Sequence, residues 1–87
     1  MFYIYILKSE KNGRYYIGST SNVERRSSQH NSGNVKFTRN IRPLRLVLVQ
    51  EVTSRIQARK VELRLKKLKR RDYIDKIVKD GRIRMDS

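Results

Sequence analysis

Cysteine and tryptophan are absent from this chain of 87 residues, and histidine and proline occur once each. Without cysteine, neither a disulfide nor a thiolate metal site can hold the fold together, and a single histidine excludes histidine-rich zinc ligation. No apolar run approaches the roughly 18 residues of a membrane span, and the N-terminus lacks the pattern of a signal peptide. We therefore expect a cytoplasmic protein without a membrane segment.

Acidic residues are also scarce, and this imbalance predicts the partner. Asp and Glu number 8 against 22 Lys and Arg, which gives a net charge of +14. Such a surface attracts polyanions, and nucleic acid is the expected one. A membrane surface would attract the same charge, but an interfacial helix also needs Trp or Phe anchors, and both Phe lie outside helical patterns. A nucleic acid rather than a membrane is therefore the expected partner.

The length of the chain limits it to a single hydrophobic core. We expect one domain over residues 1–80, followed by a short basic tail over 81–87, and the last six residues are expected to fray. Phe2–Leu7 is apolar or aromatic throughout, which is typical of a strand buried on both faces and central in its sheet.

Two further strands are predicted. A turn at residues 9–13 joins the first strand to Arg14–Thr20 in a hairpin. Leu44–Gln50 forms the third strand and is again apolar on both faces, and a basic loop over residues 33–43 precedes it.

Three helices are predicted between and after the strands. Ser21–Glu24 and Ser54–Gln57 each match a capping box, which opens a helix. The first helix should end at Asn31–Gly33. The second carries an apolar stripe of Ala58, Val61, Leu65 and Leu68. The third covers about Asp72–Lys79. The order β-β-α-β-α-α predicts an α/β domain of the α+β type, with a three-stranded, mainly antiparallel sheet flanked by about three helices.

Tyr5 and Tyr16 lie in the two strands of the predicted hairpin. A tyrosine in a strand is more often packing than chemistry, but the hairpin parity places these two on one face. A turn centred on residues 10 and 11 would set them directly opposite each other. We favour it over a tight Asn12-Gly13 turn, which would separate them by on the order of 13 Å. Gly18 follows on the same face, where a missing side chain allows a close approach.

The first helix has almost no apolar side, so polar contacts must hold it. Arg26 and His30 are four residues apart and share one helical face. Glu62 borders the apolar stripe of the second helix and is surrounded by bases. Glu62 can be a salt-bridge partner of those bases, and His30 a residue that interacts with the helix dipole. The other interpretation is that Glu62 holds Mg²⁺ or Mn²⁺, hard cations that take oxygen ligands.

These residues stand in a set of motifs that follow one another in order. The motifs are Tyr3-Ile4-Tyr5, Tyr16-Ile17-Gly18-Ser19-Thr20, Glu24-Arg25-Arg26, His30-Asn31-Ser32-Gly33, Lys36-Phe37-Thr38-Arg39 and Glu62. Over about residues 2–78 the chain resembles the GIY-YIG nuclease superfamily, and more narrowly its small stand-alone bacterial group. Tyr3 departs from the first glycine of the name motif.

The resemblance implies one divalent ion, Mg²⁺ or Mn²⁺, held by Glu62. It also implies that Tyr16 activates the attacking water with Tyr5 as its partner, and that Arg26 contacts the scissile phosphate. His30 occupies a position where relatives carry His or Tyr. Either Tyr16 or His30 can be the general base, the latter because the pKa of histidine lies near neutrality.

We therefore predict a metal-dependent endonuclease that hydrolyses DNA, with a single-stranded or structured substrate in repair or recombination. The alternative is a non-catalytic module that binds DNA or RNA through its basic surface and aromatic residues. The expected nucleic-acid contacts are Gly18, Arg25, Lys36, Thr38, Arg39, Arg42 and Lys66. The sequence leaves the oligomeric state open.

Overall fold

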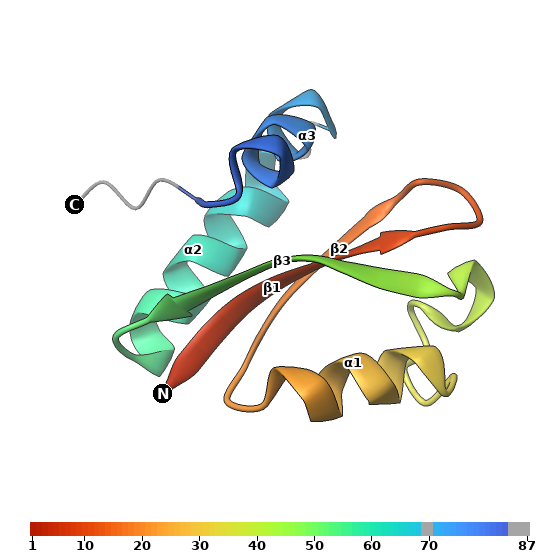
Figure 1. The fold of residues 1–87 in the computed structure, drawn as a ribbon. Coiled ribbons are helices and arrows are strands. Elements are labelled where there is room, and N and C mark those ends of the chain that lie inside the picture. Colours follow the sequence, from red (N-terminus) through yellow and green to blue (C-terminus); the bar gives the residue numbers. More distant parts are fainter. Residues whose placement is uncertain (69–70, 84–87) are drawn as a thin grey trace.

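Three strands form one antiparallel sheet in the order β2-β1-β3 (Figure 1). The structure, a computed structural model, describes residues 1–68 and 71–83. Strand β1 spans Phe2–Ser9, β2 spans Tyr15–Thr20 and β3 spans Leu44–Val52. The prediction that the first strand is central in the sheet is confirmed.

The helices follow the predicted order, which confirms the α+β fold. Helix α1 spans Val23–Asn31, α2 spans Arg55–Leu68 and α3 spans Arg71–Asp80, and a 3₁₀ turn, η1, covers Arg39–Ile41. Asn22, not Ser21, caps α1, because its side chain accepts a hydrogen bond from the Arg25 amide at 3.0 Å. Ser54 caps α2 as predicted, by accepting from the Gln57 amide at 3.1 Å.

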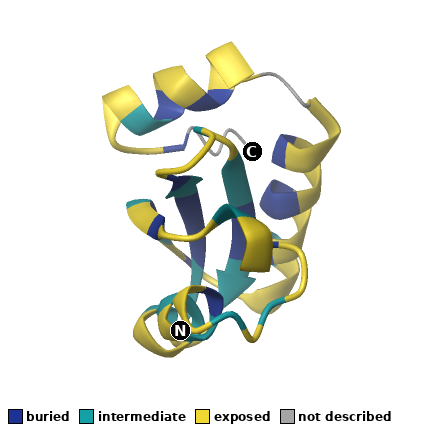
Figure 2. Ribbon diagram, turned by 90° about the vertical axis from the view of Figure 1, so that its right-hand side faces the viewer, coloured by how far each residue is buried: buried dark blue, intermediate teal, exposed yellow. Residues whose placement is uncertain are grey.

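Both faces of β1 are buried, because helices cover both sides of the sheet (Figures 1 and 2). The main core joins one face to α2 and α3 and includes Ile4, Ile6, Leu65 and Ile74. A smaller cluster on the other face contains Tyr5, Leu7 and Leu44, with Val23 of α1 packed against it. Strand β3 was expected to be apolar on both faces, but it lies at an edge, and Leu46 and Val49 are 39% and 42% exposed.

The β1–β2 hairpin has a register that lies between the two considered above. Tyr5 pairs with Gly18, and Leu7 pairs with Tyr16. The prediction that the two tyrosines lie directly opposite each other is therefore wrong. Their shared face is correct, since the rings are diagonal neighbours with centroids 6.4 Å apart.

Ser9 sets the shape of the loop that fixes this register. Its buried hydroxyl accepts hydrogen bonds from the amides of Lys11 and Asn12 at 3.1 and 3.2 Å. It donates to the carbonyl of Ile41 at 2.6 Å, 32 residues away. The turn is thus held by a tertiary contact, which local turn preferences do not contain.

The packed part of the chain continues beyond residue 80. Ile83 is 2% exposed in the main core, and its amide and carbonyl bond the side chain of Gln50 on β3 at 2.5 and 3.0 Å. Of the six terminal residues expected to fray, Ile83 is thus held in place, and residues 84–87 lie outside the described part of the chain.

Within residues 1–68 and 71–83, no helix is both long and apolar enough to cross a membrane.

Replacing Ile83 should therefore cost stability. We expect Ile83→Ala to lower the free energy of unfolding by about 2–5 kcal/mol, the usual cost of a cavity at a buried isoleucine. The exposed neighbour Arg82 provides the control, since Arg82→Ala should change the free energy of unfolding by less than about 0.5 kcal/mol. Urea denaturation followed by circular dichroism measures both. Equal, small effects would mean that Ile83 is not part of the core.

Candidate active site

Three aromatic rings gather on the face of the sheet that α1 covers. Tyr5 comes from the central strand, Tyr16 from the edge strand β2 and His30 from the last turn of α1. The His30 ring centroid lies 4.6 Å from that of Tyr16 and 6.0 Å from that of Tyr5. Tyr5 and His30 are fully buried, whereas Tyr16 is only half-buried. Tyr16 is therefore the ring of the three that solvent can reach.

Gly18 makes room for this cluster. It is the cross-strand partner of Tyr5, and a Cβ atom at this position would overlap the phenol of Tyr5. A close approach was predicted at Gly18, and the side chain that approaches it in the structure is Tyr5. A larger residue here would displace Tyr5 from its buried position.

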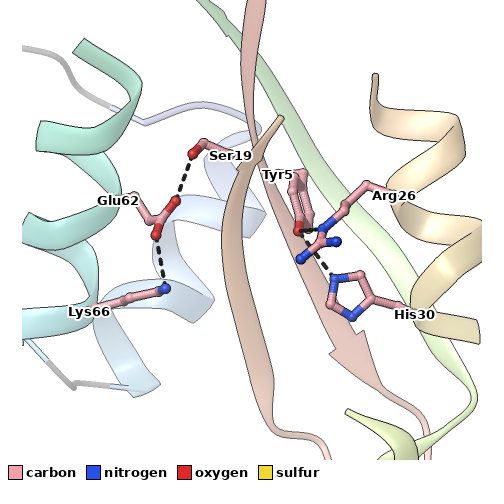
Figure 3. A network of polar contacts seen from close by, with 6 residues as sticks. All are labelled: Tyr5, Ser19, Arg26, His30, Glu62 and Lys66. Carbon is pink, nitrogen blue, oxygen red and sulfur yellow. Dashed lines mark hydrogen bonds and ion pairs between the residues drawn. The ribbon is translucent and has the colours of Figure 1, made fainter. Parts of the chain in front are cut away.

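A chain of hydrogen bonds orients Tyr5 and His30. His30 Nδ1 lies 2.8 Å from the Thr38 hydroxyl, which donates at 3.5 Å to the carbonyl of Val35. Thr38 therefore accepts from Nδ1–H, which leaves His30 Nε2 as an acceptor. The Tyr5 hydroxyl lies 3.2 Å from Nε2 and donates to it. Arg26 Nε in turn donates to the Tyr5 oxygen at 3.4 Å (Figure 3).

Burial controls the charge state of this network. It lowers the pKa of His30 to about 4, and the nearby Arg26 charge adds to the effect. His30 is thus neutral at pH 7, which fits the tautomer above and argues against a charged interaction with the helix dipole. Burial also raises the pKa of Tyr5, although the hydrogen bond from Arg26 opposes this shift.

Arg26 places a positive charge beside Tyr5 on this face. Its position on α1 lets it bond the Tyr5 hydroxyl through Nε and the Gln29 side chain through Nη1 at 3.0 Å. The Tyr5 hydrogen bond holds the pKa of Arg26 above its usual value. The guanidinium is only half-buried and borders an open polar hollow of about 320 Å³. Arg26 is therefore fixed in orientation while it faces solvent.

Glu62 lies on the other side of β2, on helix α2 (Figure 3). It is 8% exposed at the border of the main core. One carboxylate oxygen accepts a hydrogen bond from Ser19 of β2 at 2.7 Å, and the other forms an ion pair with Lys66 at 2.9 Å. The salt bridge considered from the sequence thus exists, but it engages only one of the two oxygens.

The two half-sites meet at strand β2 because it is the edge of the sheet. Ser19, the partner of Glu62, and Arg26 line the same polar hollow. From α2, Lys66 places its ammonium 5.8 Å from the centroid of the Tyr16 ring. An acid, an arginine and a half-buried tyrosine therefore surround one stretch of edge strand. Four of the five residues predicted to be catalytic, Tyr5, Tyr16, Arg26 and His30, contact one another on the α1 side of the sheet. Glu62 lies across β2 and is linked to them through Ser19 and Lys66.

The oxygen atoms at Glu62 fit Mg²⁺ or Mn²⁺ in one particular way. Within the described residues, no group of three or more His, Cys, Asp or Glu side chains could hold a metal ion. Mg²⁺ does not need such a cluster, because it usually keeps several waters and takes one or two carboxylates plus substrate phosphate oxygens. A carboxylate has more acceptor sites than its bonds to Ser19 and Lys66 fill. Glu62, with the Ser19 hydroxyl beside it, fits such an ion.

The residues predicted to contact nucleic acid are mostly on the surface. The exposed ones are Arg25, Lys36, Arg39, Arg42 and Lys66. Thr38 is different, because it is 0% exposed and bonds His30 from beneath the loop. Its prediction as a nucleic-acid contact is wrong, since the loop turns this one side chain inward to satisfy the buried imidazole.

Two further residues were missed from the sequence. Ser19 orients Glu62, and its position one residue past Gly18, hence on the opposite face of the strand, was the available signal. Phe37 is 86% exposed within the basic loop, and an aromatic residue between bases is typical of nucleic-acid contacts.

Comparison with known proteins places the chain in a family. The model of the GIY-YIG catalytic domain matches residues 1–75. The chain belongs to the GIY-YIG family. A UPF0213 protein of Listeria welshimeri is 37% identical over 71 residues, covering 80% of this chain and 78% of the relative. A UPF0213 protein of Streptococcus pneumoniae is 41% identical over 69 residues, covering 78% and 69%.

A solved structure is similar as well. The solution NMR structure of a UPF0213 protein from Bacillus halodurans has a TM-score of 0.58 and 36% identity, and the match covers 93% of this chain and 87% of that one. The small stand-alone GIY-YIG group inferred from the motifs is therefore confirmed. Membership indicates a nuclease-type catalytic domain.

The buried, neutral His30 predicts a specific pH dependence of stability. Its pKa in the folded state, about 4, lies below the usual 6.5, so the unfolded chain binds a proton first as the pH falls. Its contribution is complete above about pH 6.5 and is lost as the pH falls toward 4. Between pH 7 and 5, wild type should lose about 2 kcal/mol more unfolding free energy than His30→Asn.

Urea denaturation at the two pH values measures this difference. The carboxylates titrate in both proteins, so subtracting the variant isolates His30. Parallel losses in wild type and variant would contradict the burial of a neutral imidazole.

Proposed function

We propose that this protein is a metal-dependent endonuclease that hydrolyses phosphodiester bonds of DNA. The observation that carries the proposal is the convergence of Glu62 and Arg26 on the edge strand from opposite sides, with the polar hollow beside them. A phosphate in that hollow would lie beside a guanidinium oriented by Tyr5 and beside Ser19, whose hydroxyl bonds the Glu62 carboxylate. Membership of the GIY-YIG family supports the same reaction.

The side chains divide the work as follows. Arg26 binds the non-bridging phosphate oxygens with a charged, planar fork. Tyr5 and His30 are positioning residues, because both are buried and hydrogen-bonded to each other. Tyr5 also bonds Arg26, and His30 also bonds Thr38. Tyr16 meets the attacking water, since it is the half-buried ring at the edge of the cluster. Between the two candidate bases, the geometry thus favours Tyr16 over His30.

Glu62 supplies the ligand for the metal ion, and Ser19 holds the carboxylate in place. When bound, Mg²⁺ or Mn²⁺ would neutralise charge on the phosphate and stabilise the leaving oxygen. Lys66 neutralises Glu62 in the structure described, and its flexible, exposed ammonium can turn from the carboxylate to a phosphate.

The substrate we propose is single-stranded or structured DNA, processed in repair or recombination in the cytoplasm. The helices of the described fold pack against the sheet. We expect the exposed basic residues to contact phosphates, and such contacts carry no information on base sequence. The competing proposal is a non-catalytic module that binds DNA or RNA. We favour catalysis because a buried acid beside the phosphate site weakens simple binding and is useful with a metal ion.

Removing the charge of Glu62 separates these proposals. With Mg²⁺ or Mn²⁺, cleavage of labelled single-stranded or branched DNA should fall by at least about 100-fold in Glu62→Gln, because metal-assisted charge stabilisation contributes several kcal/mol. Binding of DNA measured in EDTA should persist in the variant. Glu51→Gln, an exposed acid on β3 with the same change of charge, is the control and should cleave normally.

The binding-module proposal would replace the nuclease proposal if the wild-type protein cuts no DNA. Wild type that cuts neither single-stranded, duplex nor branched DNA with any of these ions would contradict catalysis. Cleavage by Glu62→Gln at the wild-type rate would contradict the metal site.

A further inference from the structure

A second hollow borders the edge of β2, on the side of the sheet that α2 and α3 cover. It has a volume of about 360 Å³ and lies between β2, α2 and the start of α3. Its inner wall is formed by buried apolar side chains: Ile17, Leu65 and Ile74. A cavity of this size with apolar walls and a few polar groups is typical of a binding site for a small, flat molecule or group.

Tyr15 gives this hollow an aromatic wall that is held in place. Its ring packs against the main core, and its hydroxyl donates a hydrogen bond to the carboxylate of Asp75 on α3. A ring fixed at both ends loses little conformational entropy when a second flat ring packs against it. Tyr15 is therefore a fixed aromatic wall, and the Lys8 ammonium lies 5.5 Å from its ring centroid.

Positive charge surrounds the mouth of the hollow. Arg14, Lys66 and Arg71 line it and are all exposed. The Arg71 guanidinium lies against Gly13 in the hairpin loop, where a Cβ atom would come within 2.7 Å of it. The occupant is thus expected to combine an apolar ring with negative charge next to it, as a nucleotide does.

The hollow shares two residues with the candidate active site. Tyr16 and Lys66 line it, and the same two residues belong to the group around Glu62. An occupant of the hollow therefore lies beside residues 15–17 of β2, next to residues 19 and 20, which line the proposed phosphate position.

We propose that this hollow is a subsite for an unpaired nucleobase of the DNA strand, next to the phosphate that is cleaved. The inference rests on the proposed function and adds a base-binding subsite beside its phosphate site. A base inside a duplex is stacked and paired, so it cannot enter an apolar hollow without being extruded. Stacking and apolar contact accept every base, so the subsite favours single-stranded or unpaired DNA without reading its sequence.

The test compares DNA strands that differ only by one base. Wild-type protein in EDTA is titrated with single-stranded thymidine oligomers of about eight nucleotides, each with one abasic position, and binding is followed by fluorescence anisotropy. The phosphates are the same in all of them. We expect the loss of one particular base to weaken binding by roughly 5- to 100-fold, and losses elsewhere to matter little.

Two variants locate the effect. Tyr15→Leu keeps an apolar wall but removes the aromatic face. The abasic penalty, which is the ratio of the Kd of the abasic strand to that of the intact strand, should therefore fall toward one. Tyr73→Leu makes the same change at an exposed tyrosine of α3 that does not line this hollow, so the penalty should stay. If Tyr15→Leu does not fold, 2-aminopurine in wild type replaces it, and the base at the sensitive position should be protected from acrylamide quenching.

Several outcomes would overturn the proposal. These are an abasic penalty that is absent or equal at all positions, equal effects of the two tyrosine variants, or quenching that is equal at all positions. Since the experiment contains no metal ion and measures no cleavage, it separates the two proposals. Cleavage without a position-dependent abasic penalty would overturn the subsite alone, and such a penalty without cleavage would overturn the nuclease alone.

Discussion

The burial of β1 on both faces is the constraint on which the rest of the structure depends. Ile4 and Ile6 face α2 and α3, while Tyr5 and Leu7 face α1, and all four are 0–1% exposed. A small chain can achieve this only with helices on both sides of the sheet. Helix α1 has few apolar residues of its own, so polar contacts from Arg26, His30 and Thr38 complete its packing. The same contacts build half of the candidate site.

The edge position of β2 follows from that arrangement and brings the other half into reach. Because β2 has a neighbour on one side only, side chains from α1 and α2 can meet around its free edge. Residues of alternating direction then serve two sides: Tyr16 and Gly18 face the aromatic cluster, while Ser19 faces Glu62. The polar hollow and the apolar hollow both open on this edge. One strand thus borders the proposed sites for a phosphate and for a base.

The sequence predicted most of the fold because its patterns are local. Apolar runs and capping residues located the three strands and three α-helices of the described residues, and strand parity put Tyr5 and Tyr16 on one face. The register was wrong because Ser9 bonds Ile41, a contact across 32 residues that no turn preference contains. Thr38 was taken for a surface residue for a similar reason, since only the fold places it against the buried His30. Sequence patterns do not show which buried polar side chains bond to each other or to distant parts of the chain.

The central claim is that residues on both faces of β2 form one metal-dependent site. Titration of Mn²⁺ into isotopically labelled protein tests it directly, because the ion broadens the NMR signals of nuclei near it. We expect the amide signals of Ser19 and Glu62 on one face, and of Tyr16 and Arg26 on the other, to broaden together in wild type and not in Glu62→Gln. Broadening that persists in the variant, or that is confined to residues away from β2, would contradict the account.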